Sequence, residues 1–306
     1  SDVRFTAPQP AEATRRRPSL LTHYFQSRTN AESRAAVKRA EKVQAEAESA
    51  AGLASQPDPA SLASLKVRSR EVKRLLSEAA TCEAADDLVG TRQALRRVLV
   101  MKEAEEIRAF IERRLGAINT TLLFGDRPMP EKARHAVVAG DRISKLAKKY
   151  GCTQEFLLRA NGIERPEQLR VGRDIWALAQ PVFELTVLKR SGTAVLTLNG
   201  RFFKRYAVGV GKLAEAPTGT FAVQNRVREP VYVTAEHGDI PFGNPDNILG
   251  TCQLTLAPLE GSAPAPGLSL HGTWDESSLG RISGPGRLRF RNADIDELYV
   301  LLGSGT

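Results

Sequence analysis

The sequence contains few cysteines, three in 306 residues, and these lie far apart at Cys82, Cys152 and Cys252. It has no CxxC pair and no Cys/His cluster, so nothing indicates a zinc site. Three thiols form at most one disulfide, and cysteine usage therefore does not define the redox compartment. We expect neither a metal nor another cofactor, and we interpret Cys82 and Cys152 as packed structural residues.

Long apolar runs are also absent, since no stretch approaches the roughly 18 apolar residues of a membrane span. The chain starts at Ser1, not at Met, which is compatible with a signal or anchor segment upstream. The 42% hydrophobic share and the 26% charged share argue against wholesale disorder. A length of 306 residues favours two or three domains.

Acidic residues are in the minority, 35 against 44 Lys and Arg, which gives a net charge of +9. A basic protein associates readily with an anionic partner such as nucleic acid, an acidic lipid surface or an anionic wall polymer. The same charge also serves solubility alone. Residues 1–29 carry three consecutive arginines among prolines and show no periodicity, so we predict a flexible arm there.

Residues 30–124 show helical periodicity. An Ala/Glu/Lys/Arg-rich stretch at 31–51 is followed by a break at 52–61 and by apolar residues spaced three and four apart. Gly116 looks like the stop of the last helix. Residues 71–100 resemble one tetratricopeptide-like hairpin, although no second copy occurs at that period. We predict an antiparallel helical region, and then a Pro- and charge-rich linker at 125–134.

Residues 135–179 change to a β-α-α-β pattern. A strand at 136–138 meets a turn at Gly140-Asp141, and Asp141 is expected to cap the first helix. That helix ends at Gly151, where Thr153 caps the second helix. Asn161-Gly162 ends the second helix, and a strand at 174–178 closes the unit.

This segment resembles the LysM family through Gly140-Asp141, the Leu-Ala-x-x-Tyr-Gly run, Asn161-Gly162 and Leu-x-Val-Gly at 169–172. The resemblance implies binding of N-acetylglucosamine polymers such as peptidoglycan or chitin. It places ligand between two loops, whose candidate residues are Gly140, Asp141, Arg142, Ile143, Asn161, Gly162 and Ile163. A purely structural interpretation also fits, in which Asn161-Gly162 is a turn and Asp141 is a helix cap. The structural and the ligand-binding interpretations are compatible.

From residue 182 to 306 the pattern is one of short strands and turns. Apolar alternation at 183–187 and 194–198 ends in Asn199-Gly200, a hairpin signal. Further strands are expected at 202–210, 249–251, 268–270 and 288–290, with a helix near 294–301. The fold class is thus multidomain α+β: a helical region, a βααβ module, and an all-β sandwich or flattened barrel.

The last region resembles the L,D-transpeptidase (YkuD-type) family through an ordered set of motifs. These are Val-x-Val-Gly at 208–211, Pro-Thr-Gly-Thr-Phe at 217–221, Leu-Gly-Thr at 249–251, His-Gly-Thr at 271–273, Ser-Ser-Leu-Gly at 277–280 and Arg-x-Arg-Asn-x-Asp at 289–294. The resemblance implies transfer of a peptidoglycan stem-peptide acyl group by a cysteine thiolate, a histidine base and backbone oxyanion donors.

The family signature, Ser-His-Gly-Cys-apolar-Arg, aligns without gaps to residues 284–289. Gly286 and Arg289 match it, whereas Pro285 stands at the histidine and Arg287 at the nucleophilic cysteine. A guanidinium has no nucleophilic lone pair at accessible pH. His271 aligns with the family's base and also reads as a pocket histidine held by hydrogen bonds. With Arg287 and Arg289 it is a candidate site for a stem-peptide carboxylate.

Three functions remain open. The first is a peptidoglycan-binding pseudoenzyme of the bacterial envelope, periplasmic or wall-bound, with the LysM module on glycan and the last domain on stem peptides. The second is an active L,D-transpeptidase or carboxypeptidase that uses Cys252, or one whose nucleophile aligns differently from the family signature. The third is an envelope scaffold that recruits a protein through residues 30–124. A nucleic-acid partner explains the charge but none of the motifs, so none is expected.

Overall fold

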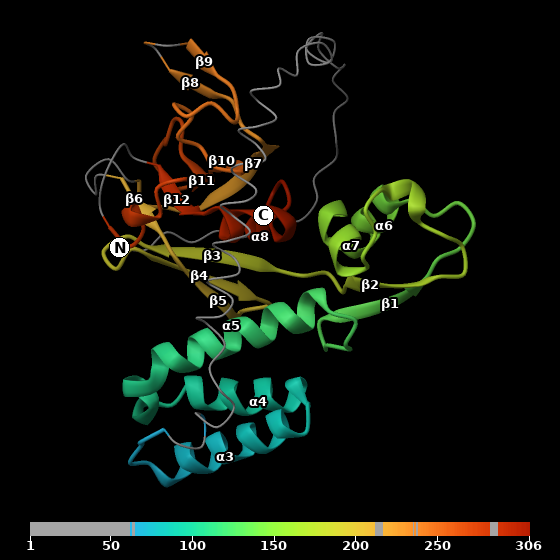
Figure 1. The fold of residues 1–306 in the computed structure, drawn as a ribbon, viewed down its shortest axis with the longest axis vertical. Coiled ribbons are helices and arrows are strands. Elements are labelled where there is room, and N and C mark those ends of the chain that lie inside the picture. The colour runs from blue at the N-terminus through green and yellow to red at the C-terminus, as the bar shows by residue number, and fades with distance from the viewer. Residues whose placement is uncertain (1–61, 63–64, 212–216, 235, 237, 282–286) are drawn as a thin grey trace.

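The computed structural model describes residue 62 and residues 65–306, with gaps at 212–216, 235, 237 and 282–286. The predicted arm at 1–29 and the predicted helix at 31–51 lie outside the described residues. So do Gly284, Pro285 and Gly286. The described chain is mixed α+β, with helices first, a small βααβ module next and a β-rich C-terminal domain last, which confirms the predicted fold class (Figure 1).

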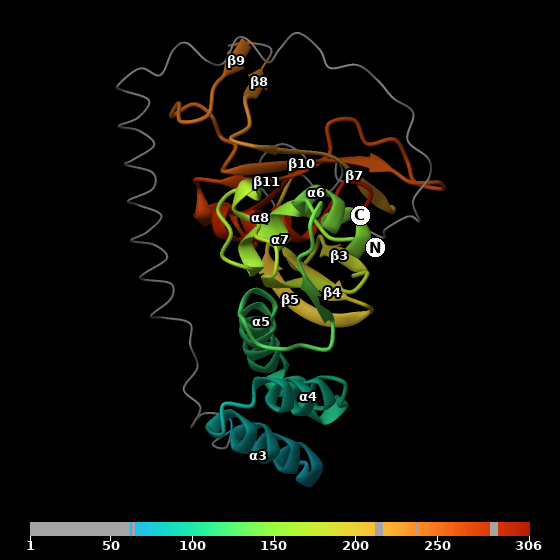
Figure 2. The same cartoon turned by 90° about the vertical axis from the view of Figure 1, so that its right-hand side faces the viewer.

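The helical region consists of α3 (Arg70–Ala84), α4 (Leu88–Leu99), the 3-10 helix η2 (Lys102–Ile107) and α5 (Arg108–Phe124). Ser69 and Asp87 cap α3 and α4, because their side chains accept from backbone N–H groups of the first turn. Each helix buries one apolar stripe, and α4 packs between α3 and α5 (Figures 1 and 2).

The prediction that Gly116 ends a helix was wrong, since α5 continues through it to Phe124. A side chain there would press on β5, because a Cβ built on Gly116 would lie 3.2 Å from Lys204 Cγ. Gly116 therefore marks a close approach of α5 to the C-terminal domain, for which a helix tolerates the backbone cost of glycine.

Residues 125–134 are tied closely to the helical region. Glu131 forms a bidentate ion pair with Arg92 of α4, with N–O distances of 2.9 and 2.6 Å. The Lys132 ammonium donates to the carbonyls of Leu122, Gly125 and Arg127, and so satisfies the C-terminus of α5. Burial lowers the pKa of Lys132 to about 8.

The βααβ module contains β1 (Lys132–Ala136), α6 (Ile143–Tyr150), α7 (Gln154–Ala160), the 3-10 turn η3 (Pro166–Gln168) and β2 (Asp174–Leu178). The first strand begins and ends earlier than the predicted 136–138, because it pairs in register with β2. Gly151 ends α6 with φ of 67°, and the Thr153 hydroxyl caps α7, as predicted. Asp141 does not cap α6.

The C-terminal domain holds two main sheets. The three-stranded sheet comprises β3 (Phe183–Leu188), β4 (Thr193–Leu198) and β5 (Arg201–Ala207). The predicted hairpin turn at Asn199-Gly200 is confirmed, with both residues at positive φ. The predicted strand at 202–210 divides after Ala207, because β6 (Gly209–Val210) leaves this sheet and joins the second one.

The five-stranded sheet has the order β6-β12-β11-β10-β7. Its further strands are β7 (Phe221–Arg228), β10 (Cys252–Pro258), β11 (Ser269–Thr273) and β12 (Leu288–Arg291). β11 and β12 are parallel and the other neighbours antiparallel. The strand expected at 249–251 is absent, because this segment bends before β10 begins. A hairpin of β8 (Tyr232–Thr234) and β9 (Gly238–Ile240), which the sequence pattern did not predict, projects from the body (Figure 2).

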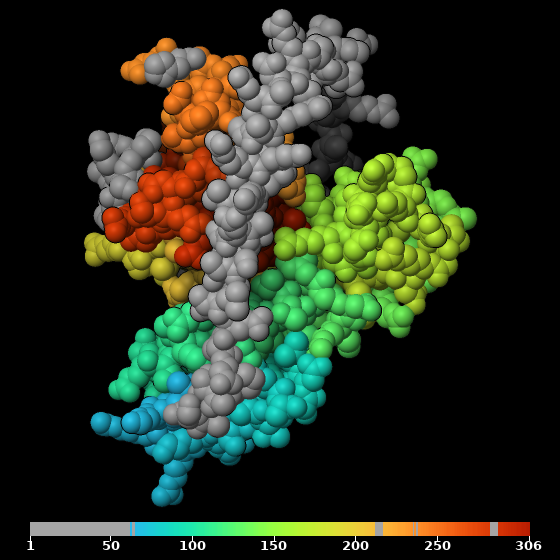
Figure 3. All heavy atoms as spheres, in the orientation of Figure 1, coloured from blue at the N-terminus to red at the C-terminus, as the bar shows by residue number. Residues whose placement is uncertain are grey.

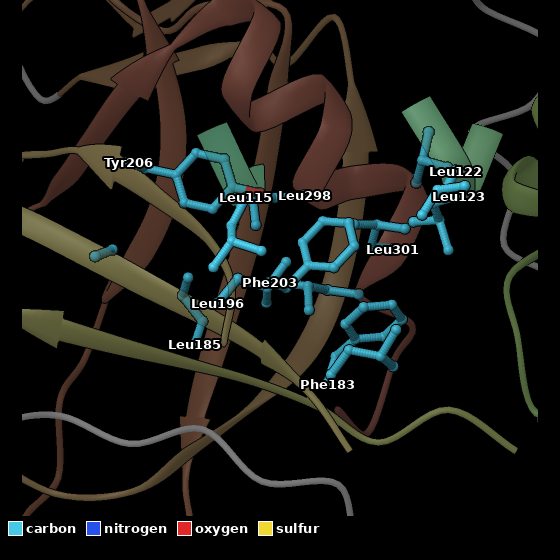
Figure 4. Close-up of a cluster of buried hydrophobic side chains, with 14 of the residues drawn as sticks. Leu115, Leu122, Leu123, Phe183, Leu185, Leu196, Phe203, Tyr206, Leu298 and Leu301 are labelled. Carbon is cyan, nitrogen blue, oxygen red and sulfur yellow. The ribbon is translucent and has the colours of Figure 1, made fainter. Parts of the chain in front are cut away.

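Helix α8 (Asn292–Leu301) packs on the five-stranded sheet and reaches the three-stranded sheet on its other side. Leu298 and Leu301 meet Phe203 of β5 and Leu122 of α5 in one apolar cluster (Figure 4). The buried Glu297 carboxylate accepts from the Tyr206 hydroxyl at 2.7 Å and pairs with Lys204 at 2.9 Å. The two sheets, α8 and α5 therefore share one core.

The βααβ module forms a separate lobe that leans on the C-terminal domain (Figure 3). Thr153 at the start of α7 donates its hydroxyl proton to the Val300 carbonyl of α8. Glu155 pairs with Arg226 of β7 at 3.3 Å, and the Phe156 ring lies 6.0 Å from Phe124. These contacts fix the module on the rest of the chain instead of leaving it on a free linker.

Candidate functional site

The central strand of the five-stranded sheet carries His271. In the sheet register, His271 lies opposite Gln253 of β10 and Arg289 of β12. Directly opposed residues point to the same face of a sheet, so these three side chains share one face. Leu270 and Phe290, one residue along, face the α8 core. One face of the sheet is therefore apolar and the other carries the candidate site.

His271 is held as a neutral imidazole. It is 1% exposed, and its Nδ1 lies 2.7 Å from the Gly272 carbonyl oxygen. A carbonyl only accepts, so Nδ1 carries the proton and Nε2 keeps its lone pair. Burial lowers the pKa of His271 to about 4; the bond to Gly272 opposes this, and the charges of Arg287 and Arg289 add to it.

Arg289 is a second buried polar group on the same face, only 9% exposed. Its Nε donates to the Ser278 hydroxyl at 3.3 Å. The guanidinium lies over Gly209 of β6, where a Cβ would come within 3.0 Å of both Nε and Nη2. Gly209 thus makes room for Arg289, and burial lowers the pKa of the arginine. The sequence offered no sign that Gly209 and Ser278 hold this guanidinium.

Arg287 lies just before β12 and not within it, so the strand register does not place its side chain on the same face as Arg289. Its guanidinium carbon is 5.7 Å from the ring centroid of Tyr232 on the β8–β9 hairpin. Its charge nonetheless reaches His271, whose pKa it lowers. Pro285 and Gly286, the other two predicted positions of this group, fall outside the described residues.

Cys252 points away from the site. Its neighbour Gln253 faces His271, and successive residues of a strand point to opposite faces. The Cys252 thiol is fully buried and lies 3.1 Å from Asp296 Oδ1 of α8. Burial and the adjacent carboxylate raise the pKa of this thiol far above its usual range. A protonated thiol behind the sheet is poorly placed for attack assisted by His271.

Because His271 is neutral and buried, stability should fall in mild acid. The unfolded histidine binds a proton below about pH 6.5, while the folded one resists protonation until about pH 4. Stability from this group is therefore complete above pH 6.5 and lost as the pH falls toward 4. Between pH 7 and 5 we expect a loss of about 2 kcal/mol, measured by urea unfolding. His271→Gln should lack this part of the pH dependence; an unchanged dependence would contradict the assignment.

The predicted glycan-binding loops lie at one end of the βααβ module. Gly140, Arg142 and Gly162 are exposed, and Asp141 and Asn161 are half-buried, whereas Ile143 and Ile163 are core residues with 1% and 4% exposure. Gly140 and Gly162 have positive φ with open space beside them. The Asn161 side chain bonds both the N–H and the carbonyl of Trp176, which fixes the second loop on β2.

The first loop is fixed by a short relay of hydrogen bonds. Asp141 Oδ2 accepts from the Val138 N–H at 2.9 Å and from His135 Nε2 at 2.8 Å. The Tyr150 hydroxyl lies 3.0 Å from His135 Nδ1, to which it donates when the imidazole is neutral. The bonds to Val138 and His135 hold the pKa of Asp141 below its usual value. Asp141 therefore folds the loop back on β1 and does not cap α6.

Replacing His135 by alanine should loosen this loop, because Asp141 and Tyr150 each lose a partner. We expect a melting temperature lower by about 2 to 4 °C. His135→Gln should recover part of the loss, since an amide can donate to Asp141. Scanning calorimetry of both variants beside Tyr150→Phe, which removes one bond only, tests this. Equal melting temperatures for His135→Ala and the parent chain would refute the relay.

Parts of the chain are similar to known proteins. The family model of the LysM domain matches residues 135–177. The putative L,D-transpeptidase YkuD of Bacillus subtilis (strain 168) is 28% identical over 178 residues, which are 56% of this chain and 94% of that protein. The putative L,D-transpeptidase YkuD of Bacillus licheniformis is 26% identical over 178 residues, again 56% of this chain and 94% of that protein. The chain thus contains a LysM domain. It is also a distant homologue of YkuD-type L,D-transpeptidases.

Solved structures give weaker similarity. An L,D-transpeptidase from Mycobacterium smegmatis aligns with a TM-score of 0.31 and 13% identity, over 45% of this chain and 73% of that one. The L,D-transpeptidase LdtMt1 in complex with imipenem aligns over the same shares with a TM-score of 0.28 and 14% identity. Within the described residues no cluster of three or more His, Cys, Asp or Glu is arranged to hold a metal ion, and no helix has the length and apolarity to cross a membrane.

Proposed function

We propose that this protein binds peptidoglycan in the bacterial cell envelope without forming an acyl-enzyme. Its LysM domain would hold the glycan through the loops at 140–143 and 161–163. Its C-terminal domain would receive a stem peptide on the face that carries His271 and Arg289, beside Arg287. The homology to putative L,D-transpeptidases and the LysM match support the ligand and the location.

The direction of the Cys252 side chain is the main support for the absence of an acyl-enzyme. The thiol of the C-terminal domain, Cys252, faces α8, whereas His271 faces the opposite side of the same sheet. The residue that aligns with the family nucleophile is Arg287, whose guanidinium cannot attack a carbonyl carbon. The competing function is an active L,D-transpeptidase, which would need Cys252 to leave the core or another residue to act as nucleophile.

The fixed charges on the site face fit an anionic group. Arg289 is buried, and an arginine in a water-poor site pairs strongly with a carboxylate. His271 is neutral, so it adds no positive charge but supplies an acceptor nitrogen. A free carboxylate at the end of a stem peptide is therefore a better ligand for this face than a neutral amide.

A sedimentation assay with purified insoluble peptidoglycan tests the binding. We expect the full chain to sediment with the polymer and Arg142→Glu, which places a negative charge in the exposed first loop, to remain more in solution. Arg190→Glu is the matched control, because it changes the net charge equally on the distant β3–β4 turn. A parent chain that stays in the supernatant would overturn the proposal.

A further inference from the structure

Two exposed valines lie at the same end of the LysM domain, beyond the last paired residues of β1 and β2. Val138 is 58% exposed and Val171 is 67% exposed, among the highest values for large apolar residues in the described chain. Just beyond the β1–β2 pairing, the Val137 N–H donates to the Arg173 carbonyl at 3.0 Å, and the Gly172 N–H donates to the Val137 carbonyl at 2.8 Å. This backbone pairing keeps both valines at the same end of the module.

Arg173 connects this valine pair to the second predicted loop. Its backbone carbonyl is bound to Val137, while its guanidinium Nη2 donates to the Asn161 carbonyl at 2.5 Å. The side chain thus crosses from the valine pair to the loop at 161–163 and is still exposed. A guanidinium has five N–H donors, so this bond leaves further donors that can face a ligand.

The carboxylates of this end of the module do not neutralise the positive charge of Arg173 through ion pairs. Two acidic residues of the same module already have partners, Asp141 bound to His135 at 2.8 Å and Asp174 bound to Arg134 at 2.7 Å. Glu164 and Glu167 are exposed on the far part of the second loop. In the part of the chain that the structure describes, Arg173 forms no ion pair with any of these four carboxylates.

We infer that Val138, Val171 and Arg173 form one binding surface that selects an N-acetylated glycan bearing carboxylates over a neutral one. The inference rests on the proposed function, because it extends the same loops. The valines cover the apolar parts of the sugar, its N-acetyl methyl groups and ring face. Arg173, anchored on Asn161, donates to a sugar carboxylate beside them. N-acetylmuramic acid carries such a carboxylate on its lactyl group, whereas N-acetylglucosamine does not.

Two soluble tetrasaccharides distinguish the contribution of the two valines from the contribution of Arg173. One is neutral tetra-N-acetylchitotetraose; the other alternates N-acetylglucosamine with peptide-free N-acetylmuramic acid. By isothermal titration we expect the full chain to bind the carboxylated glycan about fivefold more tightly, the size of an exposed ion pair. Arg173→Gln, whose amide can still donate to Asn161, should bring the two affinities together without weakening the neutral glycan. Val138→Ser with Val171→Ser should weaken both glycans.

Arg170→Gln is the matched control, because it removes an equal charge from the same exposed turn without a bond to Asn161. It should keep most of the preference. Equal affinity of the parent chain for both glycans, or an equal loss of both in Arg173→Gln, would overturn the inference while leaving peptidoglycan sedimentation intact. Failure to bind either tetrasaccharide together with failure to sediment would instead refute the proposed function.

Discussion

Replacing Arg92 by alanine is expected to lower the free energy of unfolding by about 3 to 5 kcal/mol. Arg92 is 1% exposed and pairs with Glu131, while its Nε donates to Asn119 Oδ1 at 2.6 Å. Asn119 in turn donates to the Phe203 carbonyl of β5 at 2.7 Å. Burial alone would raise the pKa of Glu131, but the Arg92 guanidinium holds it below its usual value. Alanine leaves this carboxylate charged, buried and poorly paired.

Urea denaturation of two further variants tests whether the loss of unfolding free energy comes from the unpaired Glu131 carboxylate. The double replacement Arg92→Met with Glu131→Leu should recover most of the stability, because removing both charges of a buried pair is far less costly than removing one. Arg97→Ala on the same helix should cost less than about 1 kcal/mol, since Arg97 is 53% exposed where it pairs with Glu78. Equal losses in Arg92→Ala and Arg97→Ala would refute the role of this network.

Replacing Gly272 by alanine should destabilise the C-terminal domain by about 3 kcal/mol or more, at the upper end of overpacking effects. A Cβ at Gly272 would lie 2.2 Å from Asn292 Oδ1 and 2.9 Å from Gly250 Cα. The Gly250 N–H also donates to the Gly272 carbonyl at 3.0 Å, so the two backbones cannot separate without losing a buried bond. The same carbonyl accepts from His271, and the site would be disturbed as well.

Gly303→Ala is the matched control for this glycine, because its new Cβ would meet no atom closer than 3.6 Å. We expect it to unfold within about 0.5 kcal/mol of the parent chain. Adding Asn292→Ala to Gly272→Ala should restore part of the loss, since it removes the nearest clashing atom. If Gly272→Ala unfolds at the same urea concentration as Gly303→Ala, the close approach of β11 and residue 250 is not a constraint.

Periodic and turn signals predicted much of the fold. The apolar stripes of α3 and α4, the Gly151 stop, the Thr153 cap and the Asn199-Gly200 turn depend on residues near in sequence, and each is found where expected. Gly116 failed because its reason is a contact with Lys204, 88 positions away in the chain and invisible to a local pattern. The β8–β9 hairpin was missed because its strands are three residues each, too short for alternation to register.

The sequence predicted which residues belong to the candidate site, but not how their side chains are arranged. The ordered motifs indicated His271, Arg287 and Arg289, but the shared face and the burial of His271 and Arg289 follow from the sheet register. The direction of Cys252 required the same register, since a shift of one residue along β10 would turn the thiol toward His271. His135 gave no signal as the partner of Asp141, because the two meet only after the first loop folds back on β1. The predicted domain boundaries and site roles remain predictions.

We propose above that this homologue of L,D-transpeptidases binds the wall without being acylated. Intact-mass spectrometry of the full chain after prolonged incubation with excess carbapenem tests it most directly, because an acylated nucleophile keeps the opened lactam as added mass. We predict an unchanged mass for the parent chain and for Cys252→Ala. A stoichiometric adduct on the parent chain, absent from Cys252→Ala or mapped to another side chain, would contradict the claim.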